Sequence, residues 1–497
     1  MTDSLVTLCG VLIILFLLYY YLTSNLNFWK DRGIPGPQPI PIFGNFGPLS
    51  FRTLSINYII SERYNEYKHE PAFGVFAGST PAIIVNDMDM IRDVLIRDFS
   101  LFADRGISLY PKMEPLSLHL FNLETEIWRP LRTRISPVFT SGKLKEMFPL
   151  VVECGQHLEK HLDKLVAKGE PIECRELAAQ FTTDVIGSCG FGIDMNAISD
   201  EDSEFRIMGR EIFNPDPKVI IKDLCKKFCP ILYRVVGPLL QKDHVLNFFK
   251  KVVVDTIKYR EQNNIMRPDF INMLMELKKN RQNLENIGSK SSVSVERILD
   301  IDKKRSPGVA ADFLMMFSTV IELGILKRMI YIAAAYLTDD LLASVVFGFF
   351  IAGFETSSSA MSNALYELAL NTDIQDKVRN EIRENFAQHD ETFTYEQVKQ
   401  MKYLDLVFQE TLRKYPVLPV LMRRASTNYT FKGTNITIPK NTNIWIPVRG
   451  IHLDPDIYPK PKVFDPERFT KEAVSARHPM SYLPFGDGPR NCVGMSK

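Results

Sequence analysis

A lone cysteine near the end of the chain stands in a loop broken by glycine and proline, FGDGPRNCVG, at residues 485–494. A cysteine thiolate becomes a good metal ligand when nearby donors stabilise its negative charge. Glycines allow a close backbone approach and leave N–H groups free to point at the sulfur, and the loop has three of them, Gly486, Gly488 and Gly494. We therefore expect Cys492 to be a metal ligand.

The other residues of this loop favour a flat metal complex that carries carboxylates. Arg490 supplies a fixed positive charge that suits a carboxylate, and the ring of Phe485 is placed to shield the site from water. Zinc requires three or four protein ligands, whereas haem iron is held by one or two axial ligands. The loop therefore favours haem iron over zinc, and a plain surface turn is the alternative for a single cysteine in such a segment.

The loop has the pattern Phe-x-x-Gly-x-Arg-x-Cys-x-Gly, which resembles the haem-binding loop of the cytochrome P-450 family. Further motifs resemble other parts of that family and occur in the family's order: the proline hinge GIPGPQPIPIFGN (33–45), the haem-side WRPLR (128–132), the oxygen-activating AGFETS (352–357), the Glu-x-x-Arg helix ETLR (410–413) and the arginine-bearing PERF (466–469). The resemblance is closest to microsomal animal members, particularly the xenobiotic-metabolising members of insects. Each motif alone is weak, since Glu-x-x-Arg also occurs as a plain surface pair.

The resemblance implies a role for each matching residue. Cys492 is the proximal thiolate ligand of haem b, in a cofactor-binding loop that includes Phe485 and Gly488. The haem propionates are held by Trp128, Arg132, Arg423 and Arg490, whose donors suit carboxylates. We choose Arg423 over the adjacent Arg424, because only one of the two can point inward. A buried structural ion network is formed by Glu410, Arg413 and Arg468.

A long apolar helix is predicted to begin near LTDD, with Thr338 as its N-cap and Asp339 and Asp340 at its positive end. Glu355 and Thr356 interrupt its apolar face, and such groups are costly to bury unless they are used. By the resemblance, both deliver protons toward bound O₂. Gly353 and hydroxyl back-bonding beside it predict a local opening of the helix.

The pattern of apolar residues predicts a mainly α fold with a small β region, preceded by a transmembrane helix. The resemblance implies that this fold is the cytochrome P-450 fold. Helical spacing is clear at 151–169 and 405–415, and short strand signals occur at 81–85 and 428–448. We divide the chain into an N-terminal membrane anchor at 1–32, a proline-rich hinge at 33–45 and a catalytic domain at 46–497. The expected walls of the substrate pocket are 101–121 and 213–236.

The anchor is predicted from an uncharged run at residues 5–22, whose length of roughly 27 Å as a helix matches a bilayer core. Asp3 in front of the run argues against a signal peptide, which would begin with a basic region. Lys30 and Arg32 follow the run, so the positive-inside rule places the body in the cytoplasm. We expect a single-pass protein of the endoplasmic reticulum membrane.

Two segments depart from the family pattern. Residues 306–336 are an atypical apolar insertion where a polar linker is expected, and family members continue for several dozen residues beyond the cysteine. We therefore expect a C-terminally incomplete catalytic domain, and we interpret both departures as signs of an unfinished or mis-spliced gene model.

The predicted function is a haem-thiolate monooxygenase that inserts one oxygen atom from O₂ into a lipophilic xenobiotic, hormone or lipid. Electrons come from NADPH–cytochrome P-450 reductase, with cytochrome b5 as a second candidate donor, because the chain has no nucleotide-binding glycine motif of its own. The formal net charge of +1 does not favour a nucleic-acid partner, and seven scattered cysteines do not form a disulfide framework. Two alternatives stay open: a truncated product unable to retain haem, and a haem-thiolate isomerase or lyase.

Overall fold

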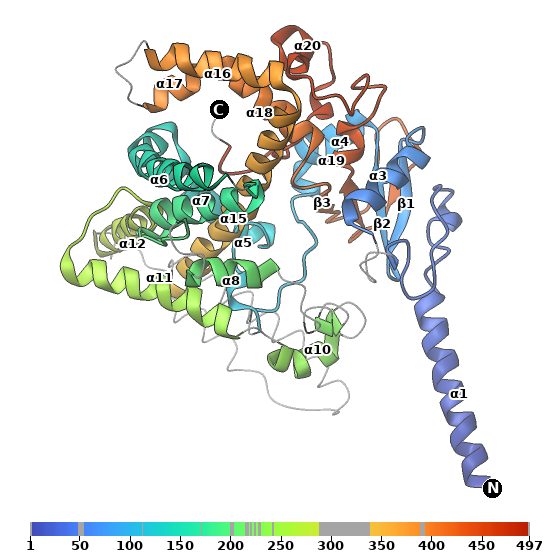
Figure 1. The fold of residues 1–497 in the computed structure, drawn as a ribbon. Helices are drawn as coiled ribbons and strands as arrows, with labels where there is room; N and C mark the ends of the chain where they lie inside the picture. The colour runs from blue at the N-terminus through green and yellow to red at the C-terminus, as the bar shows by residue number, and fades with distance from the viewer. Residues whose placement is uncertain are drawn as a thin grey trace.

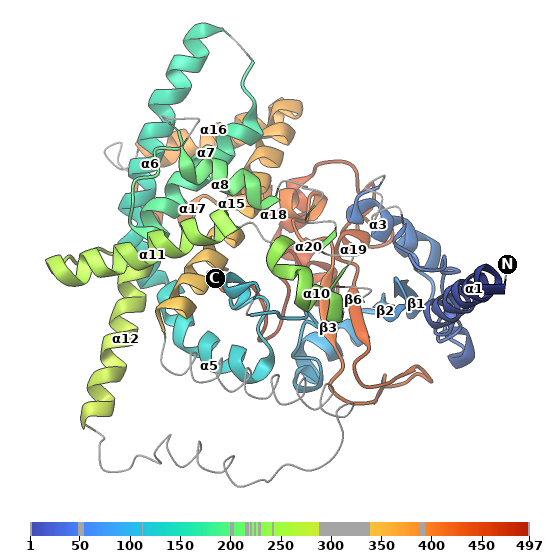
Figure 2. The ribbon, with the colours of Figure 1, turned by 90° about the horizontal axis from the view of Figure 1, so that it is seen from below.

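The computed structural model describes residues 2–47, 54–111, 113–169, 171–198, 203–213, 218, 221–222, 225–226, 230–240, 243–287, 338–387 and 393–495. Within these residues a helical body lies beside a small sheet, and helix α1 projects from the sheet side (Figures 1 and 2). The expected mainly α class with a small β region is confirmed. The predicted insertion at 306–336 lies outside the described residues.

The helices of the first part of the chain lie before residues 288–337, which the structure does not describe. They are α1 (Thr2–Thr23), α3 (Ile56–Tyr67), α4 (Met88–Arg92), α5 (Thr125–Ile135), α6 (Ser141–Lys168), α7 (Cys174–Ile186), α8 (Glu204–Phe213), α10 (Pro230–Val236), α11 (Asp243–Asn263) and α12 (Phe270–Ile287). Those of the second half are α15 (Asp339–Leu370), α16 (Thr372–Ala387), α17 (Tyr395–Gln400), α18 (Lys402–Lys414), α19 (Val448–His452) and α20 (Lys471–Ser475).

The main sheet has the strand order β1-β2-β6-β3, from β1 (Ala72–Ala77), β2 (Thr80–Val85), β6 (Asn443–Ile446) and β3 (Leu421–Arg424). β1 and β2 form an antiparallel hairpin, β2 runs parallel to β6, and β6 is antiparallel to β3. Alternate residues of β1 pack on opposite faces: Phe73 and Val75 pack against α3, and Phe76 packs in the cluster on the other face. β4 (Tyr429–Thr430) and β5 (Thr437–Ile438) form a separate pair.

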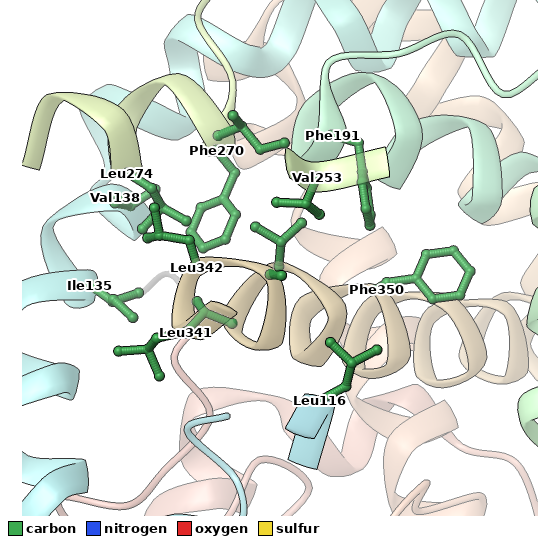
Figure 3. Packing of buried hydrophobic residues seen from close by; sticks show 14 of the residues in the cluster. Leu116, Ile135, Val138, Phe191, Val253, Phe270, Leu274, Leu341, Leu342 and Phe350 are labelled. Atoms are coloured by element: carbon green, nitrogen blue, oxygen red, sulfur yellow. The ribbon is translucent and has the colours of Figure 1, made fainter. Parts of the chain in front are cut away.

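Helix α15 runs through the middle of the helical body. Its predicted N-cap is confirmed, because the Thr338 hydroxyl accepts a hydrogen bond from the Leu341 N–H group. Asp339 and Asp340 at its first turn pair with lysines of α12 and α11. Figure 3 shows buried apolar side chains on both sides of α15, which explains why most of its surface is apolar. The helix is continuous through Gly353, so the structure does not show the predicted local opening, although the Thr356 hydroxyl makes the predicted back-bond to the carbonyl of Ala352.

The proline-rich segment after α1 is non-helical, as its composition predicts, and it packs against the sheet. Gly36 lies so close to β1 that a Cβ atom there would come within 2.1 Å of the Gly74 carbonyl oxygen. Just before this segment, the buried indole of Trp29 donates a hydrogen bond to the Val75 carbonyl at 3.1 Å. These contacts hold the segment that joins α1 to the body.

Among the described residues, the helix that is long and apolar enough to cross a membrane is α15. Half of its apolar stretch is buried inside the body, as is expected for a core helix. The segment predicted as the anchor forms α1, where apolar side chains such as Val6, Leu12 and Phe16 are exposed. Its membrane-spanning role stays a prediction.

Glu410 and Arg413 form a fully buried ion pair on α18. The Arg413 Nε and Nη2 atoms donate to the two Glu410 carboxylate oxygens at 2.6 and 2.8 Å. Arg413 also donates to the carbonyls of His452 and Pro461, so the pair joins α18 to the segments after β6. Arg468 Nε lies 3.6 Å from the Glu410 carboxylate, which brings together the three residues predicted as a network.

We predict that Glu410→Ala destabilises the protein by about 3–5 kcal/mol, because it leaves the Arg413 guanidinium buried without its counter-ion. The exposed pair of Arg63 and Glu66 on α3 supplies the control. There Glu66→Ala should cost less than about 1 kcal/mol. Denaturant unfolding of the two variants measures both effects, and equal losses would contradict the structural role of the buried pair.

Candidate active site

A cavity that is open to solvent lies between α15 and the cysteine loop. One wall comes from α15, with Val345, Gly348, Phe349 and Ala352, and the opposite wall from residues 490–493. The remaining lining residues come from α5 and from the segment before it: Arg105, His119, Leu120, Phe121, Trp128 and Arg132. Cys492, Arg490, Trp128 and Arg132, which were singled out from the sequence, therefore meet at one cavity.

The cysteine loop owes its shape to two glycines with positive φ. Gly488 has a φ of +72°, and a Cβ atom there would lie 1.9 Å from the Leu95 carbonyl oxygen. The Cys492 N–H group donates to the Phe485 carbonyl at 2.9 Å, which closes the loop. Phe485 thus holds the loop through its backbone, while the cysteine side chain itself is exposed.

The prediction that all three glycine N–H groups point at the sulfur is wrong for two of them. The Gly486 N–H donates to the Leu483 carbonyl at 3.1 Å, and the Gly488 N–H donates to the Asp487 carboxylate at 2.6 Å. Their role is conformational, because both positions require a positive φ.

Arg490 is buried against the indole of Trp128, with its guanidinium carbon 4.1 Å from the ring centroid. Its Nη2 atom donates to the Leu123 carbonyl at 2.8 Å and lies 3.8 Å from the Asp104 carboxylate. The Nε and Nη1 atoms have no hydrogen-bond partner in the described part of the chain. Two donors of a buried cation are therefore available to an anion.

The structure adds Arg105, which sequence patterns did not single out because it lies in a segment interpreted as an apolar pocket wall. Arg105 lines the cavity and donates to the carbonyls of Phe121 and Arg490 at 2.7 and 3.2 Å. An arginine within a stretch of mostly apolar residues was the available signal. Its guanidinium also lies over the Phe121 ring, at 4.2 Å from the centroid.

Arg132 and Arg423 complete a cluster of positive charges. Arg132 donates to the backbone and side-chain oxygens of Asn491 at 3.0 and 3.1 Å, which ties α5 to the residue before the cysteine. On β3 the burial alternates, so that Arg423 is 2% exposed and Arg424 is half-buried. Arg423 is therefore the inward residue of the pair. It does not line the cavity, and its Nε atom has no described partner.

The pKa values of the four arginines report how poorly this cluster is neutralised. Burial lowers the pKa of Arg490 to about 9 and that of Arg423 to about 10. Burial, followed by the charges of the neighbouring arginines, lowers the pKa of Arg105 well below its usual value. Burial also lowers the pKa of Arg132. A negative charge on Cys492 raises the pKa of both Arg105 and Arg132. The cluster thus favours an anionic ligand that contributes more than one negative charge.

Glu355 and Thr356 are not part of the cavity wall. Glu355 forms an ion pair with Arg175 of α7 at 2.8 Å, and its side chain is 29% exposed. The Thr356 hydroxyl donates to the carbonyl of Ala352, one turn back, and Ala352 lines the cavity. The predicted proton-delivery pair therefore lies next to the cavity, with the carboxylate turned toward solvent and α7.

Of the two segments predicted as walls of the substrate pocket, one lines the cavity and the described part of the other does not. Residues 101–121 contribute Arg105, His119, Leu120 and Phe121 to the cavity. The described residues of 213–236 contribute none of its lining, although they contact the first segment. Lys222 and Lys226 bind the Glu114 carboxylate at 2.7 and 2.6 Å, and the Tyr233 hydroxyl donates to it at 3.1 Å.

Comparison with known proteins identifies the class. The family "Cytochrome P450" matches residues 34–298 and 325–496. The chain is 38% identical to cytochrome P450 6a8 of Drosophila melanogaster, over 97% of this chain and 87% of that protein. It is 39% identical to probable cytochrome P450 6a14 of the same species, over 99% of this chain and 90% of that protein. It is also 39% identical to cytochrome P450 6A1 of Musca domestica, over 96% and 85%.

The chain belongs to the cytochrome P450 family. It is a haem monooxygenase. Members of this family bind haem b through a cysteine thiolate, and they use O₂, a redox partner and a small-molecule substrate. The described residues fit this cofactor. A single soft ligand, Cys492, shares the cavity with under-neutralised arginines, and the unpartnered donors of Arg490 suit the carboxylates of a haem.

We predict that Arg423→Met affects the haem-free and haem-bound protein in opposite directions. Without haem, the variant should melt at a higher temperature, because an under-neutralised buried charge is removed. With haem, the cofactor should dissociate about tenfold faster, because the variant loses the charge-assisted contact that we propose between Arg423 and a haem carboxylate. Thermal melts and transfer of haem to an acceptor protein measure the two effects.

Arg424→Met is the matched control, since it removes the same charge one residue further along β3, where the side chain is half-buried. It should leave haem dissociation within about twofold of the unmodified protein. Faster haem loss in Arg424→Met than in Arg423→Met would show that Arg424, and not Arg423, contacts the haem carboxylates.

Proposed function

We propose that the chain is a membrane-anchored monooxygenase that acts on a lipophilic xenobiotic, hormone or lipid. The reaction consumes one O₂, two electrons and two protons, places one oxygen atom in a C–H bond of the substrate and releases the other as water. Bound haem supplies the activation of O₂. The protein residues bind the cofactor, exclude water, orient the substrate and deliver protons.

The main observation in support of this proposal is that Cys492 lines the same cavity as Arg105, Arg132 and Arg490 and as α15. Cys492 would hold the haem iron through its thiolate. The carboxylates of the haem would be held by Trp128, Arg105, Arg132, Arg423 and Arg490. On the α15 side, Val345 and Phe349 supply apolar surface that suits a lipophilic substrate.

Proton delivery is proposed to run through Glu355 and Thr356. Glu355 is partly exposed and paired with Arg175, so its carboxylate can exchange protons with water. Thr356 lies one residue further along α15, and its hydroxyl contacts the carbonyl of a cavity-lining residue. Its hydroxyl can pass a proton inward by rotating away from that carbonyl.

We further propose that α1 anchors the protein in the endoplasmic reticulum membrane, with the body on the cytoplasmic side. The exposed apolar side chains of α1 and the basic residues Lys30 and Arg32 after it support this topology. On that side the electron donors are NADPH–cytochrome P450 reductase and, as a second candidate, cytochrome b5. The division into anchor (1–32), hinge (33–45) and catalytic domain (46–497) remains part of this proposal.

We predict that the full chain gives the far red-shifted Soret band of a thiolate-bound haem when it is reduced under carbon monoxide. Cys492→Ser should abolish this band and the oxygenation of substrates, because a neutral hydroxyl cannot replace the thiolate. Cys174→Ser, which removes a free cysteine on α7, should leave both unchanged.

A full chain without this band would contradict the proposal and favour a product unable to retain haem. Turnover that needs neither NADPH nor a reductase would instead favour an isomerase or lyase. A band that persisted in Cys492→Ser would show that another residue is the ligand.

We predict that Thr356→Ala diverts reducing equivalents from the product to hydrogen peroxide. The fraction of NADPH that ends as product should fall about tenfold, because a positioned proton donor contributes a factor of this order or more. Thr356→Ser keeps the hydroxyl and should retain most of the coupling. The ratio of product to NADPH consumed measures the effect, and equal ratios in the alanine and serine variants would rule out a role for the hydroxyl.

A further inference from the structure

His119 brings a polar ring into the wall of the active-site cavity, beside the apolar residues Phe121, Val345 and Phe349. It lies between two of the predicted motifs and was not singled out from the sequence. Its ring packs on α15, where a Cβ atom at Gly348 would come within 2.6 Å of the His119 Cβ atom. The glycine at 348 therefore makes room for this histidine.

The hydrogen-bonding of Asn122 fixes the tautomer of His119. The Asn122 Nδ2 atom donates to the Ser117 carbonyl at 3.1 Å, so the atom at that position is the amide nitrogen. The same nitrogen lies 3.2 Å from His119 Nε2, which must then be the acceptor. The proton of the neutral imidazole is therefore on Nδ1.

The imidazole is neutral at physiological pH. Burial, with the charge of Arg105 as a second cause, lowers the pKa of His119 to about 4. A neutral ring with Nε2 engaged has one remaining polar group, the Nδ1–H donor. This donor has no hydrogen-bond partner in the described part of the chain, and Nδ1 remains accessible to solvent.

We propose that the Nδ1–H group of His119 binds a hydrogen-bond acceptor, such as a carbonyl or ether oxygen, on the substrate. The preferred substrates are then lipophilic molecules with one acceptor oxygen rather than pure hydrocarbons, and this contact orients them against α15. The inference rests on the proposed function, because it concerns the substrate of the same cavity. A donor that is buried with an apolar ligand and left unpaired disfavours that ligand.

The test uses two ligands of similar shape, benzophenone and diphenylmethane, which differ by a carbonyl in place of a methylene. Binding is followed without NADPH through the change in the haem spectrum, so that no turnover occurs. The unmodified full chain should bind benzophenone about fivefold more tightly than diphenylmethane, which corresponds to one ordinary hydrogen bond. His119→Phe should abolish this preference mainly by weakening the binding of benzophenone.

Two further variants separate a contact with the ligand from a purely structural role. His119→Gln keeps an N–H donor and should restore part of the preference. Gly348→Ala keeps the histidine but places a Cβ atom 2.6 Å from the His119 Cβ atom, so it should displace the ring and lower the preference, at some cost in stability. The carbon monoxide band should be retained in all three variants, because the carboxylates of the cofactor are assigned to arginines.

An equal preference for benzophenone in the unmodified chain and in His119→Phe would overturn the inference while leaving the proposed function intact. Loss of haem from His119→Phe would overturn it as well, since the imidazole would then hold the cofactor. A full chain that never gives the carbon monoxide band would overturn the proposed function, and the inference with it.

Discussion

The site depends on a concentration of positive charge that the protein does not neutralise by itself. Burial lowers the pKa values of Arg105 and Arg490, and the charges of neighbouring arginines lower them further. Asp104 is a distant counter-ion at 3.8 Å from Arg490. Buried cations of this kind are unfavourable unless an anion joins them. A haem contributes two carboxylates, so the binding of the cofactor and the stability of this region are coupled.

The scaffold around the site brings together segments that are far apart in the chain. Arg132 on α5 holds Asn491, and Arg105 holds the carbonyl of Arg490, so α5 and the segment before it are tied to the cysteine loop. On the far side of the loop, Gly488 packs against the Leu95 carbonyl. The pair of Glu410 and Arg413 fixes α18 against the segments that follow β6 and lead to the cysteine. Few of these contacts are local in sequence.

Sequence patterns correctly predicted the elements that are determined by residues close together in the chain. The cap at Thr338, the strand at 81–85 and the helical spacing of α18 each depend on neighbouring residues, and the structure has them. The choice between Arg423 and Arg424 also follows from alternation along a strand, once the strand is recognised.

The predictions that failed depend on which acceptors the backbone N–H groups bind and on contacts between side chains far apart in the chain. The N–H groups of Gly486 and Gly488 are taken by neighbours within the loop, which residue types alone do not reveal. Arg105 and His119 were missed because a segment of mixed composition was interpreted by its apolar majority. Their function depends on proximity to Arg490 and Gly348, which are hundreds of residues away in the chain.

The central claim, that one cysteine sulfur and a set of arginines hold a haem in this cavity, is tested most directly by iron-edge X-ray absorption on the haem-loaded full chain. The account predicts one sulfur atom in the first coordination shell of the iron, and its absence when residue 492 is serine. A first shell of nitrogen and oxygen atoms alone in the unmodified protein would contradict it.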